Sequence, residues 1–415
     1  MKYHLIGVEG ISMCGVKKLL ENKGHIVTGS DLKTTGHSKE NVSDDVDVVV
    51  RTSAVHPDSE GWVEVETAKE KNIKVLKRSE LLGELTADKK LITISGMHGK
   101  TTTTSIAGLT MIEAGLDPTV LVGERVAEFD NEVLKIGISD YFVMESCEYD
   151  KSFLDFKSDI AIITNLDMEH LDTFVGGMPE IIESFKNFVK SIKPNGKLIL
   201  FDNDENLKKV AKSARDDIEV IYYSPHELCE GSKIIGEHNE ANVGAVLALC
   251  EVLNIDKKNV CTVAKKYIGP KRRMELIGEH KEAVVYDDYA HHPTEIITTI
   301  KTFRENFPEK KLVVVFWPHQ YNRTRSLKDE FAKSFDGASE VVLKPIYFVE
   351  GRDNKEGISS EILSGMINDN GVKSKVIEND DEIVKYLKNV AKEESLILTL
   401  GAPPIDMVAK NLIEE

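Results

Sequence analysis

The chain has 415 residues, of which 41% are hydrophobic and 30% charged, and its formal net charge is −17. This length exceeds what one hydrophobic core supports and predicts two or three domains, while the acidic balance, with no basic stripe to offset it, argues against nucleic acid as a partner. The absence of a membrane-length apolar run or a cleavable leader, and five scattered cysteines without a C-x-x-C pair, predict a cytoplasmic protein with free thiols and no membrane partner.

Residues 1–88 are predicted to form a small Rossmann-like α/β domain. A strand at 3–8 runs into a glycine turn, Gly7 to Gly15, which opens a helix, and further strands are expected at 25–29, 47–50 and 73–76. In Rossmann-like domains such a turn holds a diphosphate, and the end of the second strand, here Ser30-Asp31, meets the ribose or base. The alternative is a tight turn that needs glycine for packing alone.

Residues 89–268 are predicted to form a central ATP-binding domain around the sequence LITISGMHGKTTTT, residues 91–104. A buried strand at 91–94 ends in a glycine turn, and a helix is expected over 105–114. Such a helix N-terminus binds phosphate, with Lys100 on the β- and γ-phosphates and the Thr101 hydroxyl on Mg²⁺. Ile94 replaces the first glycine of the usual P-loop, so a plain turn with an exposed lysine is the alternative reading.

Other strands of this domain also end in functional residue types. The strand at 141–144 ends in Glu145, where nucleotide-binding sheets present a carboxylate to Mg²⁺. The strand at 160–164 precedes a polar loop that contains His170, at the edge where open α/β sheets bind ligands. The alternative is a solvated loop without function, because Asn and Asp favour turns by themselves. A buried helix opens with His238, Asn239 and Asn242. The side-chain amides of the two asparagines could bind a base or ribose beside His238, and N-capping of the helix is the alternative.

Residues 269–415 are predicted to form another open α/β sheet, with strands at 283–286, 312–316, 340–343 and 395–400. Two clusters follow the first two of these strands, DDYAHHP at 287–293 and WPHQYNR at 317–323. Adjacent aspartates repel each other, and a histidine pair flanked by proline stabilises no ordinary core. We expect these two strands to be neighbours and the clusters to be functional.

Taken together, these motifs resemble the Mur ligase family nearly from end to end. The resemblance is carried by Gly7 to Gly15, GSDLK at 29–33, GMHGKTTT at 96–103, ESCEYDKSFL at 145–154, TNLDMEHLDTF at 164–174, EHNEAN at 237–242, GPKRRME at 269–275, DDYAHHPTE at 287–295 and PHQYNRT at 318–324. Nine motifs in the right order make this resemblance specific.

The resemblance implies a three-domain ligase that uses ATP and Mg²⁺ in the synthesis of peptidoglycan precursors. It points to the branch that joins L-alanine to UDP-N-acetylmuramate through an acyl phosphate, in a monomer or homodimer whose third domain closes over the other two. The expected catalytic residues are Lys100, His170, Arg273, Asp288 and His291. Expected cofactor contacts are Gly96, Gly99, Lys100, Thr101, Thr102, His238, Asn239, Asn242, Arg273 and Asp288, expected substrate contacts are Gly10, Ser12, Asp31, His37, His319 and Arg323, and expected metal ligands are Thr101, Glu145 and His170.

Three alternatives remain open at this point. A relative within the family could attach a peptide, glycine or serine to a wall precursor. The turn at Gly7 could belong to a nicotinamide-dependent dehydrogenase, although the second glycine loop with Lys100 favours ATP. A nucleotide-binding module without catalysis is the third, and the set of Lys100, Glu145 and His170 argues against it.

Overall fold

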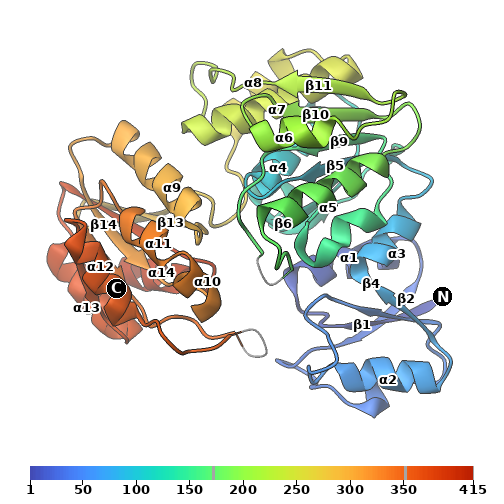
Figure 1. The fold of residues 1–415 in the computed structure, drawn as a ribbon, viewed down its shortest axis with the longest axis horizontal. Helices are drawn as coiled ribbons and strands as arrows, with labels where there is room; N and C mark the ends of the chain where they lie inside the picture. The colour runs from blue at the N-terminus through green and yellow to red at the C-terminus, as the bar shows by residue number, and fades with distance from the viewer. Residues whose placement is uncertain (171–172, 350–352, 415) are drawn as a thin grey trace. The chain divides into compact units, whose positions relative to one another are not determined.

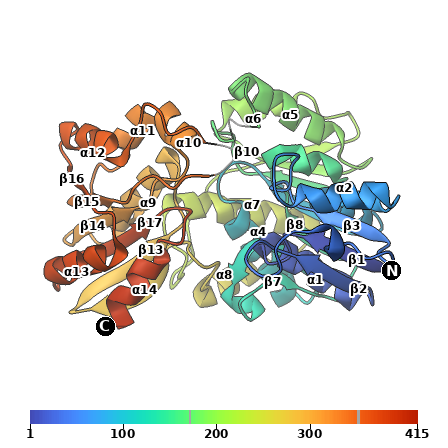
Figure 2. The ribbon, with the colours of Figure 1, turned by 90° about the horizontal axis from the view of Figure 1, so that it is seen from below.

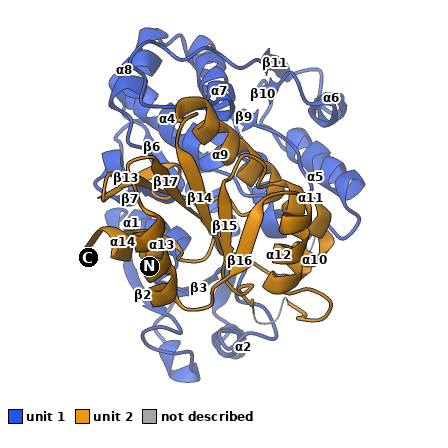
Figure 3. Ribbon diagram, turned by 90° about the vertical axis from the view of Figure 1, so that its left-hand side faces the viewer, with its two compact units in different colours: residues 1–270 blue, residues 271–415 orange. Residues whose placement is uncertain are grey.

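The computed structural model describes residues 1–170, 173–349 and 353–414, so two residues of the motif at 164–174, Leu171 and Asp172, lie outside the described residues. The chain forms two compact units, residues 1–270 and residues 271–415 (Figure 3). Three sheets, each flanked by helices, make up these units, and the predicted α/β class is confirmed. In the part of the chain that the structure describes, no helix is both long and apolar enough to cross a membrane.

The first sheet of unit 1 is parallel and has the strand order β2-β1-β3-β4. The predicted strands are all present, with ends shifted by one or two residues. The elements are β1 (Lys2–Ile6), α1 (Ile11–Asn22), β2 (Ile26–Ser30), the 3₁₀ turn η1 (Lys39–Asn41), β3 (Val48–Arg51), α2 (Trp62–Glu70), β4 (Lys74–Lys77) and α3 (Arg78–Leu85).

The second sheet of unit 1 has seven strands in the order β11-β10-β9-β5-β8-β6-β7, all parallel except β7. Helices α5 and α6 cover one of its faces, and α4, α7 and α8 cover the other (Figure 1). Its elements are β5 (Lys90–Ser95), α4 (Lys100–Glu113), β6 (Thr119–Val126), η2 (Ala127–Phe129), β7 (Glu132–Lys135), β8 (Tyr141–Glu145), η3 (Tyr149–Asp155), β9 (Ile160–Ile163), α5 (Met178–Lys190), β10 (Lys197–Phe201), α6 (Glu205–Ala211), β11 (Glu219–Tyr223), α7 (Glu237–Leu253) and α8 (Lys258–Lys266).

A shared apolar core joins the two sheets of unit 1. Met13 and Val16 of α1 belong to the same buried cluster as Leu121 of β6 and Val133 of β7. The approach is close, since a Cβ at Gly15 of α1 would lie 2.6 Å from Leu121 Cδ1. Burial of this shared apolar surface makes residues 1–270 one compact unit. The domain boundary at 88/89 falls between α3 and β5 and stays a prediction.

Unit 2 is built on one sheet with the order β12-β13-β17-β14-β15-β16, in which β12 is antiparallel. Helices α11 and α12 lie on one side of it and α13 and α14 on the other (Figure 2). Its elements are β12 (Glu275–His280), β13 (Ala283–Asp288), α9 (Pro293–Asn306), β14 (Lys311–Phe316), α10 (Tyr321–Ser326), α11 (Lys328–Lys333), β15 (Glu340–Leu343), α12 (Ser360–Asp369), β16 (Lys373–Val376), α13 (Asp380–Val390), β17 (Ser395–Leu400) and α14 (Asp406–Glu414).

Candidate active site

The glycine turn after β5 has the geometry of a phosphate-binding loop. Gly96 (φ +119°) and Gly99 (φ +82°) have backbone conformations that favour glycine, and a Cβ would collide with Thr164 Oγ1 at Gly96 and with Asn242 Oδ1 at Gly99. The helix expected over 105–114 begins five residues earlier, at Lys100, because Gly99 turns the chain directly into α4. The free N–H groups of that first turn therefore face the loop, as phosphate binding requires.

Lys100 is held inside this loop by three oxygen atoms. Its Nζ donates to the carbonyls of Gly96 (2.5 Å) and Met97 (3.0 Å) and forms an ion pair with Glu148 Oε1 at 3.1 Å. Burial alone would lower the pKa of Lys100, but the negative groups around it, first among them the Glu148 carboxylate, together outweigh burial and raise the pKa. The ammonium is therefore charged, as a lysine that faces phosphates must be.

Glu148 is a site residue that the sequence predictions missed. It is fully buried, and its Oε1 also lies 3.1 Å from Nε2 of His170. Burial would raise its pKa, but Lys100 and then His170 lower it, so the carboxylate is ionised. Among the residues described, its second oxygen, Oε2, has no hydrogen-bond partner. The signal that could have found it is the repeated glutamate of the ESCE sequence, three positions after Glu145.

The predicted metal ligands Thr101 and Glu145 are brought together. Thr101 Oγ1 donates to Glu145 Oε2 at 2.8 Å, and the backbone N–H of Gly123 donates to the same oxygen at 3.0 Å. His170 contacts Glu148 rather than Glu145. The hydroxyl and two carboxylates around Lys100 form an oxygen-rich donor set, which is the kind that Mg²⁺ prefers, and the unpartnered Oε2 of Glu148 fits a bound cation.

His170 is placed beside Glu148 by an uncommon backbone. Its φ of +52° lies in the left-handed region, and its ring packs against Tyr149 at 5.2 Å between centroids. Left-handed backbone is costly for a residue with a side chain and is found disproportionately at functional sites. Between Glu145 and Glu148 lies Cys147, whose pKa is raised to about 12 by loss of water and by the Glu148 charge.

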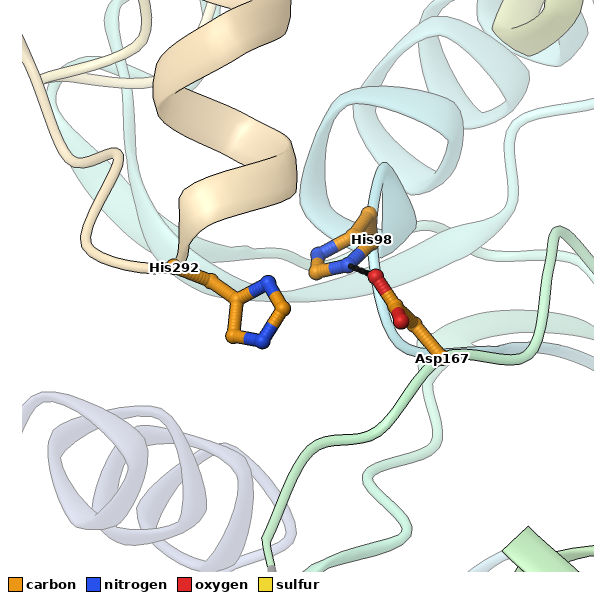
Figure 4. A group of neighbouring side chains, drawn as sticks. All are labelled: His98, Asp167 and His292. Carbon is orange, nitrogen blue, oxygen red and sulfur yellow. Dashed lines mark hydrogen bonds and ion pairs between the residues drawn. The ribbon is translucent and has the colours of Figure 1, made fainter. Parts of the chain in front are cut away.

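The polar loop after β9 braces the phosphate loop. His98 Nε2 pairs with Asp167 Oδ2 at 2.9 Å (Figure 4), and the backbone N–H of His98 donates to Asn165 Oδ1 at 2.8 Å. Thr164 Oγ1 donates to the His98 carbonyl at 2.6 Å. The sequence predictions missed His98 and Asp167, although both lie inside recognised motifs. These contacts fix the loop conformation without a ligand.

The residues predicted to contact adenosine support the same loop from α7. Asn242 Oδ1 accepts from Thr103 Oγ1 of α4 at 3.0 Å, and Asn242 Nδ2 donates to Asn239 Oδ1 at 2.9 Å. Asn239 in turn donates to the Ile235 carbonyl. His238 lies in the same first turn of α7 and Thr102 in that of α4. The structure thus gives the two asparagines a bracing role, and their contact with adenosine stays a prediction.

In the first sheet, three of the four predicted substrate residues lie around the β1–α1 turn. Gly10 caps α1 and Ser12 is in its first turn, while Asp31 follows β2 and accepts from the backbone N–H of Glu9 at 3.3 Å and of Lys33 at 3.1 Å. All three residues follow the carboxyl ends of β1 and β2, the edge at which ligands bind in open α/β folds.

The fourth, His37, belongs to a buried network centred on Glu64 of α2. Glu64 Oε1 lies 2.9 Å from His37 Nδ1, and Glu64 Oε2 lies 2.8 Å from Nε2 of His4. The carboxylate also accepts from Ser30 Oγ, from Asn41 Nδ2 and from the backbone N–H of Ser38. Burial would raise the pKa of Glu64, but these hydrogen bonds, led by that of His4, lower it to about 2. No local pattern marks Glu64, because its partners come from distant segments.

In unit 2, Asp288 at the end of β13 is fixed by backbone donors. It accepts from the N–H groups of Met274 at 2.8 Å and Ala290 at 2.9 Å, and burial raises its pKa. The Arg273 guanidinium lies 5.1 Å from the ring centre of Tyr289. His291 Nδ1 lies 3.0 Å from the Tyr289 carbonyl. These three predicted residues therefore gather around one turn, and His292 next to them caps α9 (Figure 4).

The two clusters of unit 2 meet, but not on neighbouring strands as predicted. Strand β17 lies between β13 and β14, yet the rings of His291 and His319 are 6.4 Å apart. Gly401 follows the middle strand; a Cβ there would lie 2.7 Å from the Trp317 carbonyl oxygen on one side, and its N–H donates to the Asp288 carbonyl at 3.2 Å on the other. His319 also stacks on Tyr347, and Arg323 lies in α10.

Three family models match successive ranges of the chain, and all three describe Mur ligase domains. Residues 2–90 match the model described as Mur ligase family, catalytic domain, residues 94–281 the Mur ligase middle domain, and residues 272–403 the Mur ligase, glutamate ligase domain. A protein of Clostridium kluyveri named UDP-N-acetylmuramate–L-alanine ligase is 37% identical over 99% of this chain and 97% of its own length.

Two solved structures share the fold. The UDP-N-acetylmuramate-alanine ligase of Thermotoga maritima gives a TM-score of 0.81 at 24% identity, and the murein peptide ligase of Psychrobacter arcticus gives 0.71 at 21%. Each match covers 100% of this chain and 98% of the other. The phosphate loop, its carboxylates and these full-length matches agree, and the chain belongs to the Mur ligase family.

Proposed function

We propose that this chain is an ATP-dependent ligase that joins L-alanine to UDP-N-acetylmuramate and releases ADP and phosphate. The observation that carries the proposal is the 37% identity, over 99% of the chain, to a protein that bears this name. The arrangement of Lys100, His170 and the buried Glu148 beside the glycine turn supports it. A phosphoryl-transfer site needs a positioned lysine for the phosphates and carboxylates for a metal ion.

The reaction would proceed in two steps. The lactyl carboxylate of the sugar attacks the γ-phosphorus of ATP, which gives an acyl phosphate and ADP. The amine of L-alanine then attacks the acyl carbon, and the tetrahedral intermediate loses phosphate to form the amide. Both steps bring anions together, so the site must supply positive charge and oriented donors.

Lys100 would contact the phosphates of ATP from its place in the loop, together with the first N–H groups of α4. Its bonds to the carbonyls of Gly96 and Met97 keep the ammonium within the turn before ATP arrives. Thr101, Glu145 and Glu148 would hold Mg²⁺, with His170 next to them. When bound, this ion neutralises charge on the phosphates and the carboxylate.

The remaining predicted residues complete the proposal. Gly10, Ser12 and Asp31 would bind the uridine diphosphate of the sugar, and His37 would shape that pocket through Glu64 rather than by direct contact. The nucleotide contacts of Arg273 and Asp288, and the substrate contacts of His291, His319 and Arg323, are proposed from motif position.

A second candidate is a ligase that attaches a peptide to the same sugar, because the Psychrobacter arcticus protein with this fold is named a murein peptide ligase. Phosphate release from ATP with UDP-N-acetylmuramate separates the two, with L-alanine, glycine, L-serine and the tripeptide L-Ala-D-Glu-diaminopimelate tested in parallel. Release that needs both the sugar and L-alanine, and that disappears in Lys100→Ala, supports the proposal. Release with the tripeptide alone would establish the second candidate, and no release with any acceptor would refute both.

A further inference from the structure

A thiol lies beside the pair formed by Glu148 and His170. Cys147, Glu148 and His170 each offer one potential ligand atom, and the three atoms lie within 4.8 Å of one another. The first two follow β8 and the third follows β9, so all three stand at the carboxyl end of the seven-stranded sheet. Cys147 is half-buried, and the side chain of His170 is partly exposed.

Glu148 points to a cation at this place. Both Lys100 and His170 bind its Oε1, while Oε2 is buried and without a hydrogen-bond partner in the residues that the structure describes. A buried carboxylate oxygen without a donor costs free energy. A cation bound to Oε2 would remove that cost.

The donor set favours a different cation from Mg²⁺. Mg²⁺ takes oxygen ligands in octahedral geometry, whereas thiolate and imidazole select Zn²⁺ and similar ions. Zinc takes sulfur, nitrogen and oxygen ligands from Cys, His and Glu, and three protein ligands leave a fourth position open. We propose that Cys147, Glu148 and His170 form a binding site for a thiophilic divalent cation such as Zn²⁺, which inhibits the enzyme by displacing Mg²⁺.

Binding releases the thiol proton of Cys147 to solvent, because a metal binds the thiolate. The binding part of this inference stands on the geometry of the three residues alone. The inhibition part rests on the proposed function, and the two parts are tested separately.

Binding is tested on the full chain without nucleotide, with Co²⁺ as the spectroscopic probe. We expect a near-ultraviolet charge-transfer band from a cobalt–sulfur bond, which one equivalent of Zn²⁺ removes. Cys147→Ser should abolish the band and weaken Zn²⁺ binding by at least an order of magnitude, and His170→Gln should also weaken it. The matched control is Cys229→Ser, because the thiols of Cys229 and Cys261 interact with each other away from this site.

A band that persists in Cys147→Ser, or that disappears in Cys229→Ser, would overturn the inference, as would failure of the wild type to give a band. Inhibition is tested by adding Zn²⁺ to the Mg²⁺-dependent phosphate release, with each variant compared with its own rate in Mg²⁺ alone. Cys147→Ser should need at least tenfold more Zn²⁺ for half inhibition. A cobalt–sulfur band without ligase activity would refute the proposed function but not the site.

Discussion

Two buried glutamates of unit 1 have similar surroundings and different numbers of partners. Glu64 and Glu148 are both fully buried and both contact histidine. Both oxygens of Glu64 are hydrogen-bonded, and its donors come from β1, the end of β2 and the segment at 37–41. Glu148 uses one oxygen for Lys100 and His170, and in the described part of the chain its other oxygen has no partner.

The difference separates a structural carboxylate from a functional one. A buried carboxylate whose hydrogen bonds are complete holds segments together and has no capacity left for a ligand. A buried carboxylate with an unmet oxygen retains that capacity, at a cost in stability that a ligand can recover. Burial and a histidine neighbour therefore do not identify a ligand site by themselves. A buried oxygen that lacks a hydrogen-bond partner is what distinguishes the functional carboxylate from the structural one.

The largest expected effect follows from Glu148→Gln. The amide keeps the shape of the side chain but removes the charge that faces Lys100 and a bound cation, so the rate of phosphate release should fall by about 10²- to 10³-fold. Circular dichroism should show that the variant is folded. A rate within tenfold of the wild type would show that Glu148 is structural, like Glu64.

Glu64→Gln should give the opposite pattern, with a large loss of stability and a small loss of turnover. The new NH₂ group faces the Ser30 hydroxyl if it replaces Oε2, and the donors Asn41 Nδ2 and the Ser38 N–H if it replaces Oε1. Breaking this network should cost about 3 kcal/mol of unfolding free energy. Urea unfolding of the wild type and both glutamine variants measures it. If kcat falls more in Glu64→Gln than in Glu148→Gln, the assignment of Glu64 as structural and Glu148 as functional is wrong.

The acid sensitivity of unit 1 should also depend on Glu64. Its pKa is lowered to about 2 in the folded protein, whereas an unfolded glutamate titrates near about 4.3. The folded state therefore gains stability from Glu64 above pH ~5, and this gain, at most roughly 3 kcal/mol, is lost as the pH falls from ~5 toward ~2. Urea midpoints measured at several pH values should decline less steeply over this range in Glu64→Gln. Parallel declines would contradict the assignment.

A smaller effect is expected from a substitution in the glycine turn before Lys100, which contacts Glu148. Gly99→Ala places a methyl group against Asn242 in left-handed backbone, while Gly115→Ala adds the same backbone strain with no atom within 4 Å. Both should cost about 1 to 2 kcal/mol of stability from the backbone. Gly99→Ala should in addition lower the rate of phosphate release, and the difference between the two variants isolates the contact with Asn242. Equal rates in the two variants would show that this contact does not matter.

Residues in local motifs were predictable from the sequence. Glu145 ends one apolar strand, and Lys100 and Thr101 follow another through the glycine turn. The rule that parallel strands present ligands at their carboxyl ends placed the three residues together. Their roles stay predictions, but their convergence did not need the structure. The apolar strands at 91–94, 312–316 and 395–400 were found for the same reason, since continuous burial leaves a continuous apolar run.

Contacts between distant segments were not predictable. The pairing of His170 with Glu148 depends on a left-handed backbone at His170, which no residue type requires. The partners of Glu64 come from three separate segments, so no spacing reveals them. Strands β12 and β16 at the sheet edges are half exposed and lack an apolar run, and the insertion of β17 between β13 and β14 depends on topology rather than on local sequence.

The environment of Lys100 also decides how this site could be inhibited. Amine-directed covalent reagents attack the neutral form of lysine, and the Glu148 carboxylate keeps the Lys100 ammonium protonated while three oxygen atoms surround it. Such reagents will modify the exposed lysines of the surface long before they reach Lys100. A compound directed at this turn should therefore present an anion to the lysine, and not an electrophile.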